Sequence, residues 1–431
     1  MFKVIIIGAG LGGLACAIAC RRYGLEVIVL EQASRITPVG AGIQVPSNAS
    51  RVLKWLGVFE QVREHACLLD YLDLKRFEDG SHILSRSAQS TEQRYGAPWM
   101  VIHRADYHRV LLDAATTSGV EIRLGASVKK INFEKTLVEV DGGQILSANV
   151  IVGADGLWST ARDQILGYPS APGETGDLAY RATLKTADLL ALNDDRVAEL
   201  CTQKRCTLWM GPNKHCVLYP LKGGSEFNLV LIRPDNLPPG TNKVQGEIGE
   251  MRETFQGWDN RLTKIISRIP SVLKWKLCFH DELDTWNKGN VTLLGDACHP
   301  TLPYQAQGAA MAIEDGAVLG HLLGSLIEDY KQSPDLAHGH MNSLLQVYEK
   351  LRKLRTTTNV KGAQANRYMF HLEDGDEQRR RDAELKSHDW IRPSRWRWAD
   401  GTAQDELLGH DVIAESEREY NAWKTGITHR L

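Results

Sequence analysis

The chain has 431 residues, of which 43% are hydrophobic and 24% are charged, and its formal net charge is −2. This length predicts two intertwined domains and a tail, with room to bury a large ligand. The small net charge gives no electrostatic reason to expect binding to nucleic acid or to a membrane. The eight cysteines show no Cys-x-x-Cys pair and no zinc-like spacing, so we expect reduced thiols, a cytoplasmic protein and no metal site.

The first 30 residues predict a βαβ unit. Residues 3–7 form a β-branched run that fits a buried strand, residues 14–23 have helical apolar spacing, and residues 25–30 are the next strand. Such a unit implies a parallel sheet with a right-handed crossover.

The next elements extend this first domain. The pattern predicts a helix over residues 101–117, strands over 121–124 and 127–133, a hairpin turn at 141–143 and a further strand over 150–152.

The pattern then changes to alternating segments separated by turn signals, over residues 178–278, which predicts a second, mostly antiparallel sheet. A buried-strand pattern returns at residues 291–294, so the first domain is expected to be discontinuous. We therefore expect one domain from residues 1–177 and 279–370, an inserted domain at 178–278, and a helical or extended tail at 371–431.

The tail is polar and carries four of the 11 tryptophans, at positions 390, 396, 398 and 423. This composition favours a docked helix and an extended arm whose tryptophans pack on the main body. A nucleic-acid-binding or partner-binding arm is the alternative. The most apolar helical stretch, residues 309–327, is interrupted by Glu314, Asp315 and His321, which argues against a membrane span.

A glycine motif follows the first strand. In Gly8-x-Gly10-x-x-Gly13 the first glycine permits a tight turn, the second lets a pyrophosphate approach the backbone, and the third lets helix and strand pack closely. Glu31 ends the second strand, where a carboxylate can accept hydrogen bonds from a ribose. A simple strand-to-helix turn is the alternative, and the motif alone does not separate NAD from FAD.

A later segment favours FAD. Asp296 follows a short apolar strand, where its carboxylate can hold the hydroxyl groups of a ribityl chain. A helix beginning near Gly308 would point its N-terminal amides at the far end of the ligand, where a reduced flavin is negatively charged. A helix N-terminal loop without a ligand is the alternative.

Taken together, these motifs resemble a known family. The resemblance rests on residues 8–13, on residues 152–156 with Ser159 and Arg162, on residues 294–308, and on the loop at residues 40–49. These segments are similar to those of the single-component FAD-dependent aromatic hydroxylases, most closely the salicylate hydroxylase-like group, and the match spans most of residues 1–370. The resemblance implies an α/β fold with a Rossmann-like FAD-binding domain, an inserted mostly antiparallel substrate domain and a C-terminal helical region.

The resemblance also assigns cofactor contacts. Asp155 and Gly156 match a motif near the FAD pyrophosphate that is also implicated in binding the nicotinamide cofactor. Arg104 matches an arginine that reaches the flavin's phosphates or ribityl chain, with a surface arginine at a helix N-cap as the alternative. Asp296 matches the ribityl-binding aspartate, and Pro303 matches the proline beside the reactive carbon of the flavin. Gly42, Gly308 and Ala309 are the remaining cofactor-binding positions.

The chemistry follows from the same resemblance. NADH or NADPH would bind without a Rossmann domain of its own, reduce the flavin and leave. Oxygen would then add to give a flavin C4a-hydroperoxide, which transfers an OH group to an electron-rich ring.

Three residues are candidates for the substrate side. His215 and Tyr219 lie four residues apart on one expected strand, so alternation points both side chains to the same face. In related hydroxylases a His and a Tyr at this spacing contact the substrate and activate its phenol; a buried tyrosine beside a structural histidine is the alternative. Arg181 is a candidate clamp for a substrate carboxylate, or an ordinary strand-edge arginine. We interpret His299 as packing the loop, with a catalytic base as the alternative, and Cys298 as buried and inert.

The leading hypothesis is thus a monooxygenase that hydroxylates a phenolic, salicylate-like acid, with decarboxylation at the attacked carbon as one outcome. Two alternatives stay open. One is a flavin monooxygenase that epoxidises or dearomatises a larger secondary metabolite. The other is a non-catalytic escort or binding protein on a flavoprotein-like fold. The expected partners are a small aromatic substrate and O2, with the chain as a monomer or homodimer.

Overall fold

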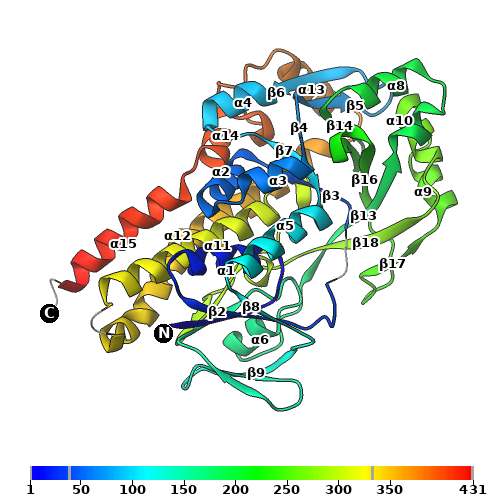
Figure 1. Ribbon diagram of the computed structural model, residues 1–431. Helices are drawn as coiled ribbons and strands as arrows, with labels where there is room; N and C mark the ends of the chain where they lie inside the picture. The colour runs from blue at the N-terminus through cyan, green and yellow to red at the C-terminus, as the bar shows by residue number, and fades with distance from the viewer. Residues whose placement is uncertain (1, 37–39, 332–333, 429–431) are drawn as a thin grey trace.

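The computed structural model describes residues 2–36, 40–331 and 334–428 (Figure 1). It is an α/β fold with a parallel sheet, a second and larger sheet, and helices packed on both. The predicted fold class is confirmed.

The first sheet has six strands, of which all but the edge strand β19 run parallel. In spatial order the strands are β19 (Asn287–Lys288), β20 (Val291–Leu293), β12 (Val150–Gly153), β1 (Lys3–Ile7), β2 (Glu26–Glu31) and β8 (Glu121–Leu124). The register pairs Ile7 with Gly153 and Gly153 with Leu293. The motifs at residues 8–13, 152–156 and 294–308 therefore lie at the carboxyl ends of three neighbouring strands, where ligands of parallel sheets bind.

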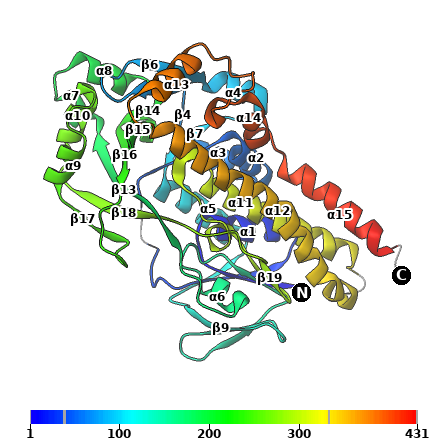
Figure 2. The same ribbon diagram turned by 180° about the vertical axis from the view of Figure 1, so that it is seen from behind.

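Helices α1 (Leu11–Arg22) and α11 (Gly308–Asp329) pack tightly against each other on one side of this sheet (Figure 1). At Gly320 a built Cβ atom would lie 2.3 Å from the Cβ of Ala19, so the two helices are in close contact there. Helix α12 (Pro334–Phe370) packs across α11. It is seen best in Figure 2, where the molecule is turned by 180°. Helix α6 and strand β9 lie on the opposite side of the parallel sheet.

Helix α11 is long and apolar enough, by length and composition, to cross a membrane. Most of its apolar stretch is nevertheless buried inside the protein. Glu314 and Asp315 are fully buried in it, and each lies 2.7 Å from a guanidinium nitrogen of Arg352. We conclude that α11 is a core helix, because a helix in lipid would not carry this buried charge network.

The second sheet has eight strands and is antiparallel except for the β14–β5 pair, as expected of a mostly antiparallel sheet. In order, its strands are β17 (Lys243–Gly246), β18 (Val272–Phe279), β13 (Gly173–Lys185), β16 (Glu226–Pro234), β15 (Lys214–Leu221), β14 (Arg205–Gly211), β5 (Tyr71–Arg76) and β6 (His82–Ser87). The last two come from a part of the sequence for which we predicted no strand. On the outer face, Tyr180, Leu218 and Leu229 pack on the small helices α7 to α10.

Two small sheets complete the strands: β11-β10-β9 (Ile145–Ser147, Leu137–Val140, Val128–Asn132) and β3-β7-β4 (Gly42–Val45, Met100–His103, Ala66–Leu68). The prediction of a helix over residues 101–117 was wrong at its start. Residues 101–103 belong to strand β7, and helix α5 covers Arg104–Thr117. The remaining α-helices are α2 (Ser47–Leu56), α3 (Phe59–His65), α4 (Ala88–Tyr95), α6 (Thr160–Leu166), α7 (Thr186–Leu190), α8 (Asp195–Thr202), α9 (Ile248–Thr254) and α10 (Asn260–Ser267).

The C-terminal region is docked on the main body. It forms α13 (Asp376–Lys386), α14 (Gly401–Leu408) and α15 (Val412–Thr428). Trp390 donates a 2.7 Å hydrogen bond to the carbonyl of Ser85 on β6, and the guanidinium of Arg86 lies 4.3 Å from its ring centroid. Trp396 is buried. These contacts agree with tryptophans packing on the body rather than with a free arm.

Candidate active site

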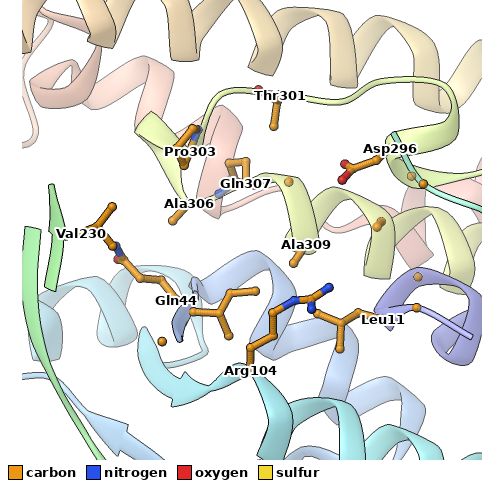
Figure 3. A pocket seen from close by; sticks show the side chains of 18 of the residues that line it. Leu11, Gln44, Arg104, Val230, Asp296, Thr301, Pro303, Ala306, Gln307 and Ala309 are labelled. Atoms are coloured by element: carbon orange, nitrogen blue, oxygen red, sulfur yellow. The ribbon is translucent and has the colours of Figure 1, made fainter. Parts of the chain in front are cut away.

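A cavity of about 360 Å³ lies where the carboxyl ends of the parallel strands, the start of α11 and the inner face of the eight-stranded sheet meet. Figure 3 shows this cavity from close by. It is lined by most of the residues that the sequence singled out: Gly10, Gly13, Gly42, Arg104, Gly156, Arg181, His215, Tyr219, Asp296, Pro303, Gly308 and Ala309.

The glycine loop forms one end of the cavity. A Cβ atom on Gly13 would lie 2.2 Å from the carbonyl oxygen of Gly8, so only glycine lets α1 begin this close to β1. Beside Gly10 the space is open, with no protein atom within 4 Å of a built Cβ. Open space at the N-terminus of a helix that presents free amides suits a pyrophosphate.

Asp296 and Arg104 project into the cavity from opposite sides, with Ala309 of α11 between them (Figure 3). Burial among protein atoms raises the carboxyl pKa of Asp296, and His299 and Arg104 oppose this rise. The side chain is nevertheless exposed on the side that faces the cavity. Hydroxyl groups of a ligand would satisfy such a carboxylate. The cation of Arg104, the open space at Gly10 and this acceptor together fit the phosphate and sugar parts of FAD.

The loop that carries Asp296 is held by α11. The Asp315 carboxylate accepts a hydrogen bond from the amide of Gly295 at 3.0 Å and lies 2.5 Å from Nε2 of His299. Cys298 is buried beside them. His299 therefore packs the loop, as expected, and does not line the cavity.

Three predicted cofactor residues, Gly8, Glu31 and Asp155, are not among the cavity-lining residues. Glu31 accepts hydrogen bonds from the amide of Ala9 at 3.0 Å and from that of Ala33 at 2.9 Å. The side chain of Asp155 accepts hydrogen bonds from Ser159 Oγ at 2.5 Å and from backbone amides at the start of α6. Their contact with a cofactor stays a prediction, and for Asp155 the structure adds a helix-capping role.

On the substrate side, His215, Tyr219 and Arg181 project from the inner face of the eight-stranded sheet into the cavity. His215 and Tyr219 share this face because they lie four residues apart on β15, as alternation predicts. The structure also brings Gly42 against the ring of Tyr219: a Cβ at that position would lie 2.4 Å from the ring.

Burial sets the charge state of this face. It lowers the pKa of His215 and raises that of the Tyr219 hydroxyl, so both are neutral near pH 7. Burial and then Arg104 also lower the pKa of Arg181, although nearby Tyr219 opposes the shift. Nε of Arg181 has no hydrogen-bond partner within the described residues. Nε is itself buried, so it marks a desolvated guanidinium rather than a donor that opens onto the cavity.

Several lining residues were not predicted from the sequence. Val217 shares the face of His215, and Val230 and Ile232 lie on the neighbouring strand β16. Alternation along both strands could have predicted these three. His371 is not a lining residue, but it lies 2.7 Å from His215. It follows α12 and could not have been predicted from strand patterns. Among the described residues, no cluster of His, Cys, Asp or Glu suits a metal ion.

Known proteins with similar sequences identify the family of this chain. A family model described as an FAD binding domain matches residues 1–363. The FAD-dependent monooxygenase OpS4 of Beauveria bassiana (strain ARSEF 2860) is 39% identical over 425 residues, covering 96% of each chain. The chain belongs to the FAD-dependent aromatic monooxygenase family.

One further relative and one solved structure are also similar to this monooxygenase. The 3-hydroxybenzoate 6-hydroxylase 1 of Aquipseudomonas alcaligenes is 34% identical over 380 residues, covering 86% of this chain and 91% of the relative. A solved salicylate hydroxylase substrate complex has the same fold, with a TM-score of 0.78 at 22% identity over 97% of this chain and 98% of the other. FAD is therefore the cofactor of this monooxygenase, and NADH or NADPH the reductant.

Proposed function

We propose that this monooxygenase hydroxylates a phenolic aromatic acid of the salicylate or hydroxybenzoate type, with loss of CO2 where the attacked carbon carries the carboxylate. One observation carries the proposal: Arg181, His215 and Tyr219 face the cavity from one side of one sheet, with Pro303 also in its lining. A guanidinium suits a carboxylate, and a neutral imidazole suits a phenol.

The cofactor end would be held by the glycine loop, Arg104 and Asp296. When bound there, FAD accepts electrons from NADH or NADPH and delivers an activated oxygen atom to the ring.

The remaining steps fall to this chain's own side chains. Arg181 would fix the substrate carboxylate, so that the ring lies against the loop of Pro303 in one orientation. His215 would accept the phenol proton at Nε2, and Tyr219 would donate a hydrogen bond from its neutral hydroxyl. Val230 and Ile232 form an apolar wall that excludes water from the reacting ring.

A larger aromatic metabolite is the second candidate substrate. A smaller cavity of about 50 Å³ adjoins the first and shares Gln44, His215 and Pro303 with it. It gives room for a ring substituent beyond a simple hydroxybenzoate. The relatives include fungal FAD-dependent monooxygenases as well as hydroxybenzoate hydroxylases.

We also propose a cytosolic location, because all eight cysteines are free thiols. Fractionation of the expressing cells would test this, and recovery of the protein in a secreted or membrane fraction would contradict it.

The proposed function is tested by a substrate panel of salicylate, 3-hydroxybenzoate and the neutral phenol 3-methylphenol. Substrate-stimulated NAD(P)H oxidation and product mass are measured together. We expect a product 16 mass units heavier, or the decarboxylated equivalent, for at least one acid. Oxidation of NAD(P)H that yields only peroxide with every acid would reject the proposal.

The Arg181→Gln variant tests the clamp. Loss of one charge-assisted hydrogen bond is worth about 1.5–3 kcal/mol, so KM for an acid should rise about ten- to hundredfold. KM for the neutral phenol should stay unchanged. Arg63→Gln, at an exposed position on α3, is the matched control. An equal effect of Arg181→Gln on acid and neutral phenol would contradict the clamp.

A further inference from the structure

His215 is one half of a buried histidine pair. Its Nδ1 lies 2.7 Å from Nε2 of His371, with ring centroids 5.0 Å apart. His215 is 3% exposed and His371 is 8% exposed. The other ring nitrogen of His215, Nε2, has no hydrogen-bond partner within the described residues, and the ring lines both the large and the small cavity.

Nδ1 of His215 and Nε2 of His371 face each other at hydrogen-bond distance, so only one of these two nitrogens can carry a hydrogen. Burial is the main cause that lowers the pKa of both rings, that of His371 to about 4, so both are neutral near pH 7. One facing nitrogen then carries hydrogen and the other accepts it. When His215 carries it on Nδ1, its Nε2 presents a lone pair to the cavity.

We propose that His371 is a positioning residue that forms the outer half of a two-histidine relay, which carries the proton of a substrate hydroxyl from His215 to solvent. This inference rests on the proposed function, since it requires a phenolic substrate.

The proton balance of the relay is complete without another reactant. The substrate O–H bond breaks as an N–H bond forms at Nε2 of His215. The Nδ1–H bond of His215 breaks as an N–H bond forms at Nε2 of His371, and His371 releases the proton on its Nδ1 to water. A phenolate remains in the cavity, and each imidazole stays neutral with its hydrogen moved to the other nitrogen. This matters because a lone buried histidine would have to hold a costly positive charge.

The groups around His371 leave the relay intact. Tyr304, whose ring lies 5.0 Å from that of His215, donates its hydroxyl to the Asp177 carboxylate at 2.6 Å. Arg367 binds both oxygens of Asp177, at 2.5 and 2.8 Å. Asp177 raises and Arg367 lowers the pKa of His371, so their charges partly cancel. Asp177 is thus occupied, and the exposed part of His371 provides the exit to water.

The backbone also fixes the outer ring. The amide of Asn213, on the turn before β15, donates a 3.1 Å hydrogen bond to the carbonyl of His371. The end of α12 is thereby tied to the strand that carries His215. This connection holds the two rings in register.

The test uses the full-length FAD-loaded enzyme with 3-hydroxybenzoate and with salicylate as probes. The His371→Gln variant keeps a hydrogen-bond acceptor for His215 but cannot pass a proton on. Two quantities are measured from pH 5.5 to 9.5: the phenolate absorbance of the bound probe, in the absence of reductant, and kcat. His82→Gln, at an exposed position on β6, is the control.

For His371→Gln we expect the apparent pKa of the bound phenol to rise by about one unit or more. We expect kcat at pH 7 to fall on the order of a hundredfold, the lower end of the range of general-base effects. KM should stay within about twofold. With 3-hydroxybenzoate as the probe, activity should recover toward pH 9.5, where its phenol begins to ionise unaided. FAD content and thermal stability verify the fold, and His371→Asn replaces the variant if either is lost.

A wild-type pH profile in His371→Gln, in an enzyme that hydroxylates the probe, would overturn the relay and leave the proposed function standing. Absence of hydroxylation of every phenolic probe by the wild-type enzyme would overturn both.

Discussion

At the scale of single residues, Asp296 shows how one side chain can be surrounded by protein and still open to a ligand. Its carboxylate faces the cavity, and His299 and Arg104 oppose the rise in its pKa that burial causes. The loop beneath it is held by Asp315 and does not depend on Asp296 itself. Removing the carboxylate should therefore affect the ligand more than the fold.

We predict that Asp296→Ala yields a folded protein depleted of FAD. The loss of charged hydrogen bonds to sugar hydroxyls should cost about 1.5–3 kcal/mol of binding free energy, which is about a ten- to hundredfold rise in the Kd for FAD. The ratio of flavin to protein absorbance after gel filtration measures this. Asp141→Ala, at an exposed hairpin turn, should keep full flavin. Full flavin retention by Asp296→Ala would remove the anchoring role.

At the scale of elements, the position of α11 depends on its contact with α1. Gly316 and Gly320 of α11 both face the backbone of α1, and a Cβ on Gly320 would also lie 2.9 Å from the carbonyl carbon of Ala19. Gly308 and Ala309, at the start of the same helix, line the cavity. A shift of α11 away from α1 would thus move the helix end that faces the cofactor.

Gly320→Ala should lower the free energy of unfolding by about 1–3 kcal/mol, because the added methyl group must push two backbones apart. FAD should also bind more weakly. Thermal unfolding and flavin titration measure the two effects. Gly339→Ala, in α12 with open space around the built Cβ, is the matched control and should be neutral or stabilising by up to about 1 kcal/mol. Equal free energies of unfolding for the two variants would contradict this prediction and would show that α1 and α11 can accommodate the methyl group.

A second contact between elements is a buried charge network. Glu314 and Asp315 of α11 pair with Arg352 of α12, and Arg355 lies 2.8 Å from Glu314. Burial alone would raise the pKa of Glu314, but Arg355 and Arg352 together hold it below its ordinary value. Because Asp315 also binds the Gly295 amide, this network connects the packing of two long helices to the loop of Asp296.

At the scale of the whole molecule, stability should depend on pH through the buried histidines. The folded protein holds His371 at a pKa of about 4, against about 6.5 in an unfolded chain. The unfolded state therefore binds more protons below pH 6.5, so this contribution to stability is present above that pH and is lost as the pH falls toward 4. Each such histidine contributes a slope of up to about 1.4 kcal/mol per pH unit.

Urea unfolding of the wild type and of His371→Gln between pH 4.5 and 7.5 measures this slope. The variant should lose stability less steeply than the wild type below pH 6.5, whereas His82→Gln should follow the wild type. Parallel curves for all three proteins would show that His371 does not titrate between the two states in this range.

Much of the fold could be predicted from local pattern. Strand β1 coincides with the predicted residues 3–7, and α11 begins at Gly308, as its glycine and loop signals indicate. Strands β5 and β6 were missed because their place in the second sheet depends on β14, more than 100 residues later in the chain. Local pattern cannot show a pairing partner at such a distance.

The sequence by itself determined the cofactor. The glycine loop, Asp296 and the start of α11 carry their chemistry in short motifs at the ends of strands, and parallel strands align those ends at one edge of a sheet. Only the tertiary structure decided how the substrate side is built. His371 meets His215, and Arg181 faces the same cavity, because a long helix and a separate sheet fold over the cofactor edge. Side chains brought together across such distances share no local pattern, and burial, which sets their charge, exists only once the chain has folded.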